Sequence, residues 1–327
     1  MARLLIGSSL RHIAERWPVI HRFIWVVESF LFGCFLVLAW LMPLSWAQAI
    51  ASRGMGFLGP RQFKHRRVQR NLELAFPDSS PSEREAMGRA LWGNIGKVFA
   101  EYAHLARLNR NFAKSIEVVG GEHLTRLSAA GQAAVLVSPH LGNWEISGCA
   151  MAQMGLEVSA VYTPLQNPYL DRIIARCRRA GHGSGLLARD ESMRAMLREI
   201  AQGRSVGLIM DQRVDSGSPV PFFGIDKLTS LIPARLAVRH GIDLIPVRTE
   251  RLAHGRFRVT FLPPVEAPSD VVGDVQKAIA MTTTVNEYFE DWIRAVPEDW
   301  FITQRLWAKD AEPAATASLA VPDSGRA

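Results

Sequence analysis

A histidine and a carboxylate five residues apart are the side chains of this sequence with the clearest chemical potential. His140 follows the apolar run 133–137 and a Ser-Pro pair, and Glu145 follows after Leu-Gly-Asn-Trp. A carboxylate bonded to one imidazole nitrogen fixes the tautomer and steadies the imidazolium, which leaves the other nitrogen free to take a proton from a hydroxyl. The spacing therefore predicts His140 as a general base oriented by Glu145. The alternative is a loop histidine near a solvated glutamate.

The elements around this pair decide whether the two side chains can meet. The apolar run predicts a strand, Pro139 disfavours helix at Ser138, and the residues from Leu141 onward can start a helix. Side chains five apart on one helix point roughly 140° from each other, so the pair can meet only if His140 precedes the helix. We therefore expect His140 in a strand-to-helix loop at the mouth of a sheet.

From residue 116 the chain alternates between apolar strand-like runs and helical patterns. Strands are expected at 133–138, 157–162, 205–210, 243–249 and 256–262, and helices near 142–154, 168–180, 190–202, 229–240 and 272–295. This alternation predicts an α/β fold with a mixed, largely parallel sheet and helices on both faces. The last two strands, joined by residues 251–255, look like an antiparallel hairpin.

Polar and basic residues gather where the predicted strands end, which is where ligands bind in such sheets. Asp211 and Gln212 follow the strand 205–210. The predicted helix 168–180 and the loop after it are rich in arginine, with Arg172, Arg176, Arg178, Arg179 and Arg189. Arginines near His140 favour a phosphorylated or carboxylated ligand, and a solvated helix face is the alternative.

No cofactor or metal is predicted. The loop Gly181-His-Gly-Ser-Gly185 lacks the order of a Walker A loop or a dinucleotide fingerprint. The three cysteines have neither CxxC nor Cys/His spacing, which argues against a zinc site and a disulfide framework. A Ser-His-Glu hydrolase is a further alternative, but the sequence has no Gly-x-Ser-x-Gly elbow to support it.

The block from Ser138 to Glu145 resembles the His-x4-Asp/Glu motif of glycerolipid-type acyltransferases, and specifically of the bacterial lipid A late acyltransferases, the lauroyl/myristoyl acyltransferase family. Further blocks between about residues 60 and 300 resemble the same family. They are Arg66-Arg-x3-Asn-x4-Phe76-Pro, Tyr162-x-Pro-x2-Asn-Pro168, Arg176-x-Arg178, Asp211-Gln212 and Val220-Pro-Phe-Phe-Gly224. Arg213 stands where many relatives carry a second Asp, and the segment Trp300–Trp307 departs from the family's Trp-x3-Arg-Arg ending. The departures leave the choice of acceptor open.

The resemblance implies an enzyme that moves a fatty acyl chain from an acyl carrier protein or CoA thioester to a hydroxyl of a lipid A precursor. His140 and Glu145 would be catalytic, with helix-start amides after residue 141 as oxyanion donors. The substrate-binding residues it implies are Arg178, Arg176, Arg189, Asn143, Asp211, Gln212, Phe222 and Phe223. The two phenylalanines would line an acyl chain, or alternatively belong to the core. Another lipid acceptor (phospholipid, glycolipid or aminolipid) and a non-catalytic lipid-binding relative are the alternatives.

The N-terminal part of the chain points to a membrane. Residues 1–70 hold ten Lys/Arg and two Asp/Glu, so the net charge of +7 resides there, which fits an anionic membrane rather than nucleic acid. The apolar segment 23–42, interrupted only by Glu28, is about 30 Å long as a helix, enough to span a bilayer. Glu28 and Pro43 keep an interfacial anchor open, and a cleaved signal peptide ending at 47–49 is a further alternative.

The expected organisation has three parts. Residues 1–55 form a basic amphipathic leader and anchor, residues 56–310 the catalytic domain, and residues 311–327 an Ala/Ser/Pro-rich disordered tail. Short helices are expected at 66–76 and, capped by Ser80, from about 81 to 108. The excess of Lys/Arg after the apolar segment places the main body on the cytoplasmic side of the inner membrane.

Overall fold

A seven-stranded sheet forms the centre of the molecule. The computed structural model describes residues 18–182, 185–188 and 192–314 of the 327. The strand order is β1-β9-β8-β2-β5-β3-β4, with bounds β1 Ile116–Val119, β2 Ala134–Ser138, β3 Val158–Tyr162, β4 Gly185–Ala188, β5 Ser205–Ile209, β8 Asp243–Arg251 and β9 Phe257–Phe261. Every pair is parallel except β8 with β9, so the predicted mixed, largely parallel sheet and its closing hairpin are confirmed.

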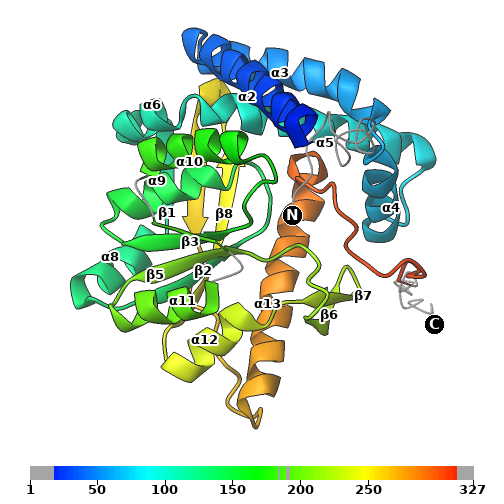
Figure 1. Cartoon of the computed structure of the whole chain (residues 1–327). Coiled ribbons are helices and arrows are strands. Elements are labelled where there is room, and N and C mark those ends of the chain that lie inside the picture. Colours follow the sequence, from blue (N-terminus) through cyan, green and yellow to red (C-terminus); the bar gives the residue numbers. More distant parts are fainter. Residues whose placement is uncertain (1–17, 183–184, 189–191, 315–327) are drawn as a thin grey trace, which may run out of the picture.

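Helices cover both faces of the sheet (Figure 1). One face packs against α8 (Gly121–Ala130), α9 (Glu145–Gln153), α10 (Pro168–His182) and α6 (Leu105–Arg110). The other packs against α11 (Ser192–Ala201), α12 (Ile232–His240) and α13 (Asp274–Ala295). The β2 strand AVLVS is buried at all five positions because both of its faces are covered.

The N-terminal helices lie against the α/β part of the molecule. The apolar segment forms α2 (Pro18–Leu41), Pro43 interrupts the chain, and α3 (Leu44–Leu58) follows, with η1 at Gly59–Arg61 and α4 at His65–Ala75. α5 (Pro81–Tyr102) begins with the predicted capping box of Ser80 and Glu83. α3 packs so closely on α5 that a Cβ at Gly96 would lie 2.2 Å from the Ala51 carbonyl oxygen.

All five predicted strands and the five helices predicted between and after them are confirmed within a few residues. The helix α3 was not predicted from the sequence; it follows Pro43 directly, and its close approach to α5 depends on Gly96. Also unpredicted are α8, the short α7 (Phe112–Ser115), β1 and β4, and the two-stranded sheet of β6 (Ser218–Phe222) and β7 (Ile225–Thr229). Apart from α8, these elements have too few residues for a clear period. The short 3-10 turns η3 (Ala253–Gly255) and η4 (Pro297–Asp299) complete the elements. The leader before residue 18 and the tail from 315 lie outside the described residues.

Candidate active site

The loop after β2 carries His140 and is held in one conformation. Gly142 has φ +59°, and a Cβ there would lie 2.5 Å from the Thr249 carbonyl oxygen, so only glycine fits. The loop pairs with the segment after α13: the Phe301 amide donates to the His140 carbonyl at 2.7 Å. Leu141 forms an isolated antiparallel bridge with Trp300. His140 therefore sits in a fixed strand-to-helix loop, as predicted.

The carboxylate bonded to His140 is Asp211. The His140 Nδ1 and Asp211 Oδ1 atoms are 2.6 Å apart, and the His140 backbone amide donates to Asp211 Oδ2 at 3.0 Å. The sheet register explains this contact. Ser138 of β2 pairs with Ile209 of the adjacent parallel strand β5. His140 lies two residues after Ser138 and Asp211 two residues after Ile209, so the two side chains leave the sheet side by side.

The surroundings of Asp211 keep it ionised. Burial opposes the charge, but the neighbouring His140 and Lys227 and the hydrogen bonds to the carboxylate hold its pKa below the usual value. One of these bonds comes from Trp300 Nε1, which donates to Oδ2 at 2.9 Å. An ionised Asp211 accepts the proton on His140 Nδ1, so the lone pair of the ring is on Nε2.

His140 Nε2 is available for proton transfer. It has no hydrogen-bond partner among the described residues, and the side chain is 19% exposed within the wall of a cavity. The Trp144 ring stands edge-on to the imidazole with centroids 4.7 Å apart, and Phe301 lies at 6.3 Å. These rings restrict the imidazole without using its second nitrogen, the arrangement a general base needs.

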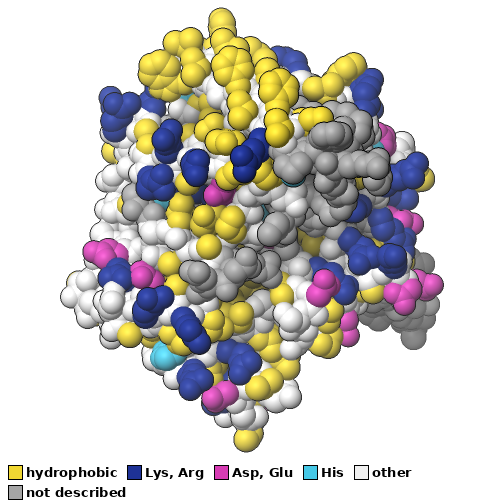
Figure 2. Space-filling model, in the orientation of Figure 1, with side chains coloured by type: hydrophobic (Ala, Val, Ile, Leu, Met, Phe, Trp, Pro, Cys, Tyr) yellow, Lys and Arg dark blue, Asp and Glu magenta, His cyan; other side chains and the backbone are white. Residues whose placement is uncertain are grey.

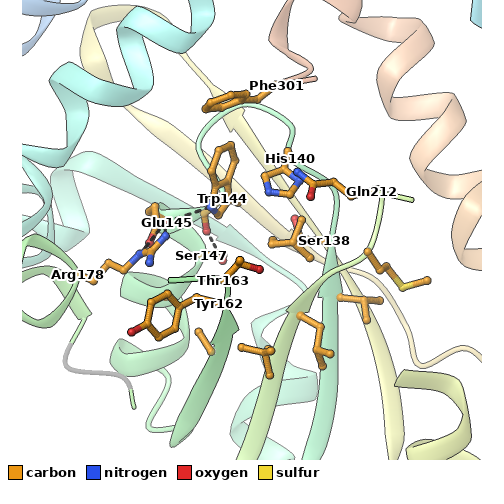
Figure 3. A pocket seen from close by; sticks show the side chains of 18 of the residues that line it. Ser138, His140, Trp144, Glu145, Ser147, Tyr162, Thr163, Arg178, Gln212 and Phe301 are labelled. Carbon is orange, nitrogen blue, oxygen red and sulfur yellow. Dashed lines mark hydrogen bonds and ion pairs between the residues drawn. The ribbon is translucent and has the colours of Figure 1, made fainter. Parts of the chain in front are cut away.

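Glu145 does not orient His140, which corrects the expectation from the sequence. Its carboxylate accepts from Arg178 Nε at 2.9 Å and from the Tyr102 hydroxyl at 2.7 Å. In Figure 3 the Trp144 ring stands between His140 and the Glu145–Arg178 pair. The physical reason is that Glu145 opens α9 and faces α10, while Asp211 is already in the plane of the sheet beside β2.

The Glu145–Arg178 pair is an internal ion pair. Glu145 is only 6% exposed, and although burial opposes its charge, the Arg178 guanidinium holds its pKa well below the usual range. Burial and the adjacent carboxylate raise the pKa of Tyr102, so its hydroxyl stays protonated and donates. The pair therefore fixes the start of α9, and with it the His140 loop, to α10.

A second buried network holds the other side of the loop. Arg251 in β8 donates to both carboxylate oxygens of Glu101 in α5, at 2.6 and 3.0 Å, and to the Gly142 carbonyl at 3.2 Å. Asn143 donates from its side chain to Glu101 Oε2 at 2.8 Å and accepts the Glu145 amide at 3.1 Å. Asn143 is thus a loop-holding residue with no exposed surface.

A cavity of about 690 Å³ opens beside His140, within the roughly 300–1,000 Å³ typical of ligand sites. Apolar side chains from the strands and from α9 and α10 line it below the polar rim shown in Figure 3. They include Leu136, Val158, Ala160, Leu208, Met151 and Ile174. Such a wall accepts a long apolar chain with its reactive end at the histidine. The part of the chain that the structure describes contains no group of three or more His, Cys, Asp or Glu side chains that could hold a metal.

Comparison with known proteins agrees with this geometry. The model of the bacterial lipid A biosynthesis acyltransferase family matches residues 15–309, nine-tenths of the chain. The chain belongs to this family. It is a lipid acyltransferase, the resemblance seen in the sequence is confirmed, and the family implies an acyl donor, a lipid acceptor and association with a membrane.

Individual relatives differ in the lipid that their names specify. A Haemophilus influenzae lipid A biosynthesis acyltransferase is 25% identical over 287 residues, covering 85% of this chain and 87% of its own. The Escherichia coli lipid A biosynthesis lauroyltransferase is 27% identical, with 77% and 82% covered. A Mycobacterium tuberculosis phosphatidylinositol mannoside acyltransferase is 30% identical, with 69% and 72% covered.

The remaining predicted site residues of this acyltransferase lie in several places. Gln212 is exposed in the cavity wall next to Asp211. Arg178 also reaches the wall, but its Nε and Nη2 atoms are engaged by Glu145. Arg176 is exposed on α10 and outside the wall, and Arg189 lies outside the described residues.

Phe222 and Phe223 belong to the core. They are 0% and 5% exposed and pack against Trp300 and Trp307, and neither lines the cavity. The expected oxyanion amides at the start of α9 are also partly engaged. The Gly142 amide donates to Asp299, and the Glu145 and Ile146 amides donate to Asn143.

Proposed function

We propose that this enzyme transfers a fatty acyl chain from a thioester to a hydroxyl of a lipid A precursor, as a step of lipopolysaccharide biosynthesis. The observation that carries the proposal is the His140–Asp211 pair, whose free Nε2 faces an apolar cavity. The names of the lipid A relatives support the acceptor, and two of those we compared cover most of both chains.

In the proposed reaction the oxygen of the acceptor hydroxyl attacks the thioester carbonyl while His140 Nε2 takes the hydroxyl proton. The tetrahedral intermediate then collapses, the carbon–sulfur bond breaks, and the imidazolium returns its proton to the departing thiolate. Asp211 fixes the tautomer and stabilises the imidazolium. Glu145, predicted from the sequence for this role, acts instead by holding the loop through Arg178.

The acyl chain is proposed to lie in the cavity while the thioester stays at its mouth. The donor is an acyl carrier protein or CoA, and the reaction needs no cofactor or metal. Gln212 is proposed to contact the substrate because its side chain is exposed at the rim beside Asp211. Arg176 and Arg189 stay proposed binding residues for the acceptor's phosphate. Arg178 is proposed to contribute less to this binding, because Glu145 already neutralises its guanidinium.

The placement of α2 supports an anchor that lies in the membrane interface. The Asn167 side chain donates to the Trp25 carbonyl, Glu28 and Ser29, so one side of α2 is fixed to the domain. The opposite side is apolar and exposed, with Phe23, Phe30, Leu38, Leu41 and, in α3, Trp46 and Ile50. These side chains form the apolar cluster over α2 in Figure 2.

Among the described residues, only α2 is long and apolar enough to cross a bilayer. We propose that α2 and α3 instead lie in the plane of the cytoplasmic leaflet of the inner membrane. Glu28 then pairs with Asn167 instead of entering hydrocarbon. Residues 1–55 would hold the enzyme to the membrane, residues 56–310 would carry catalysis, and residues 311–327 would be a tail. The proposed boundary between residues 55 and 56 falls inside α3, which continues to Leu58.

An acyl transfer assay tests the function. Purified enzyme in detergent receives a lauroyl or myristoyl acyl carrier protein thioester and either a lipid A precursor or a mannosylated phosphatidylinositol. We expect transfer to the lipid A precursor and less than about one hundredth of that rate for His140→Ala. Transfer to the mannolipid alone would refute the lipid A precursor as the acceptor and favour the acceptor named for the relative from Mycobacterium tuberculosis. Wild-type activity of His140→Ala would refute the mechanism.

A further inference from the structure

A lysine lies buried directly behind the His140–Asp211 pair. Lys227 in β7 has no exposed surface. Its Nζ donates to the backbone carbonyl of Asp211 at 2.8 Å and stands 3.9 Å from the centre of the Phe222 ring. A carbonyl and a ring face are weaker partners than a carboxylate, so the ammonium is held close to Asp211 without forming a direct ion pair with it.

Burying a lone ammonium is costly, so its place in the fold requires compensation. The charged groups around it are Asp211 beside β5 and Glu290 of α13, with Arg294 tied to Glu290 at 2.7 Å. Burial lowers the pKa of Lys227 to about 8, and the two carboxylates oppose that shift. The position therefore holds a cation at neutral pH whose charge is close to being lost.

We propose that Lys227 is a positioning residue that sets how strongly Asp211 holds a proton on His140. With Lys227 charged, the carboxylate of Asp211 is neutralised while His140 is neutral. When His140 takes the acceptor's proton, the new positive charge is balanced by the tetrahedral oxyanion, so the site stays neutral throughout. The inference rests on the proposed role of His140 as the base.

The alternative is that Lys227 only fills space and bonds the Asp211 carbonyl. The two roles differ in what removal of the charge does. Without the ammonium, Asp211 is an uncompensated buried carboxylate and attracts a proton to His140 more strongly. The protonation of His140 should then persist to higher pH. A purely structural role changes the folding stability and leaves the titration unmoved.

The direct test is a titration of His140 followed by long-range ¹H–¹⁵N spectra of ¹⁵N-histidine-labelled enzyme in detergent, without substrate. The signal is assigned with His140→Gln. Lys227→Gln keeps a donor for the carbonyl but removes the charge, and Lys227→Arg keeps the charge. Lys114→Met, at an exposed lysine in α7, is the matched control.

We expect the titration midpoint of His140 in Lys227→Gln to rise by about half a pH unit or more, with Lys227→Arg and Lys114→Met close to wild type. A midpoint in Lys227→Gln equal to that of wild type overturns the proposal.

The kinetic consequence is measured separately. The acid limb of the pH profile of kcat/KM should move to higher pH in Lys227→Gln and not in Lys114→Met. A shifted His140 titration without any acyl transfer by the native enzyme would refute the proposed function and leave the assignment of Lys227 intact.

Discussion

Asp211, the side chain that orients His140, stands 71 positions away from it in the sequence. The sequence did single out Asp211, as a substrate-binding residue after a strand, and it placed His140 correctly in the loop. It could not show that β5 lies beside β2, because strand order depends on the packing of the whole sheet rather than on local pattern. Glu145 had the right spacing, but its direction is set by Arg178 on a distant helix.

Glycine at position 142 should be essential because of two separate effects. Alanine there must adopt φ near +59° and would also meet the Thr249 carbonyl. Gly131→Ala is the matched control, since Gly131 has φ +60° with open space around it. We expect Gly131→Ala to cost about 1 kcal/mol without loss of kcat, and Gly142→Ala to cost more and lower kcat at least tenfold. Thermal unfolding measures the loss of stability and steady-state kinetics the loss of kcat. Equal losses in the two variants would refute the predicted clash with the Thr249 carbonyl.

Glu145 should stabilise the fold in a pH-dependent manner. Its folded-state pKa lies below the ordinary value, so its contribution is fully present above about pH 4.5 and is lost as the pH falls further. Glu145→Gln should therefore lower Tm at pH 7, and the difference from wild type should narrow only below about pH 4.5. Thermal unfolding from pH 7 to 3 measures this. A difference that stays constant over the whole range would contradict an ionised Glu145.

At the scale of elements, the Glu145–Arg178 ion pair joins α9 to α10, and His182 of α10 lies 3.7 Å from the same carboxylate. Removing either partner of such a pair leaves a buried charge and costs about 3–5 kcal/mol, whereas removing both costs less than the sum. We expect Glu145→Gln and Arg178→Met to be strongly non-additive in Tm, and kcat to fall in both. Additive effects on Tm would mean that the two side chains act independently.

The sequence predicted the strands and helices around the site well because their apolar runs are long and bounded by Gly and Pro. It predicted less of what holds the site together. The Arg251–Glu101 network and the Trp300 contacts join segments more than 80 positions apart, and nothing in the local pattern of either segment marks them.

At the scale of the whole molecule, the apolar outer sides of α2 and α3 decide how the enzyme meets the bilayer. Phe30→Glu and Leu38→Glu should reduce binding to vesicles of anionic phospholipid at least tenfold, because charge in the interface opposes insertion. Val272→Glu is the control, since Val272 is 90% exposed before α13. Co-sedimentation with vesicles measures the effect. Unchanged binding of both variants would contradict a membrane contact through α2 and α3.

The orientation of the chain separates an in-plane anchor from a spanning one. An in-plane α2 leaves the N-terminus on the same side as the catalytic domain, whereas a spanning helix places the two on opposite sides. Alkaline phosphatase fused to residue 1 should be inactive in cells, because that enzyme needs the oxidising periplasm for its disulfides. High phosphatase activity with a cytoplasmic catalytic domain would show that α2 spans the membrane.

The most direct test of the His140–Asp211 mechanism is the kcat of acyl transfer by Asp211→Asn. The amide keeps the shape of the side chain, but it removes the charge that fixes the His140 tautomer and stabilises the imidazolium. With Tm and acceptor KM followed alongside, we expect kcat to fall about 100-fold or more while KM changes less than about threefold. An Asp211→Asn enzyme with the kcat of wild type would contradict the assignment of Asp211 as the partner of the catalytic base.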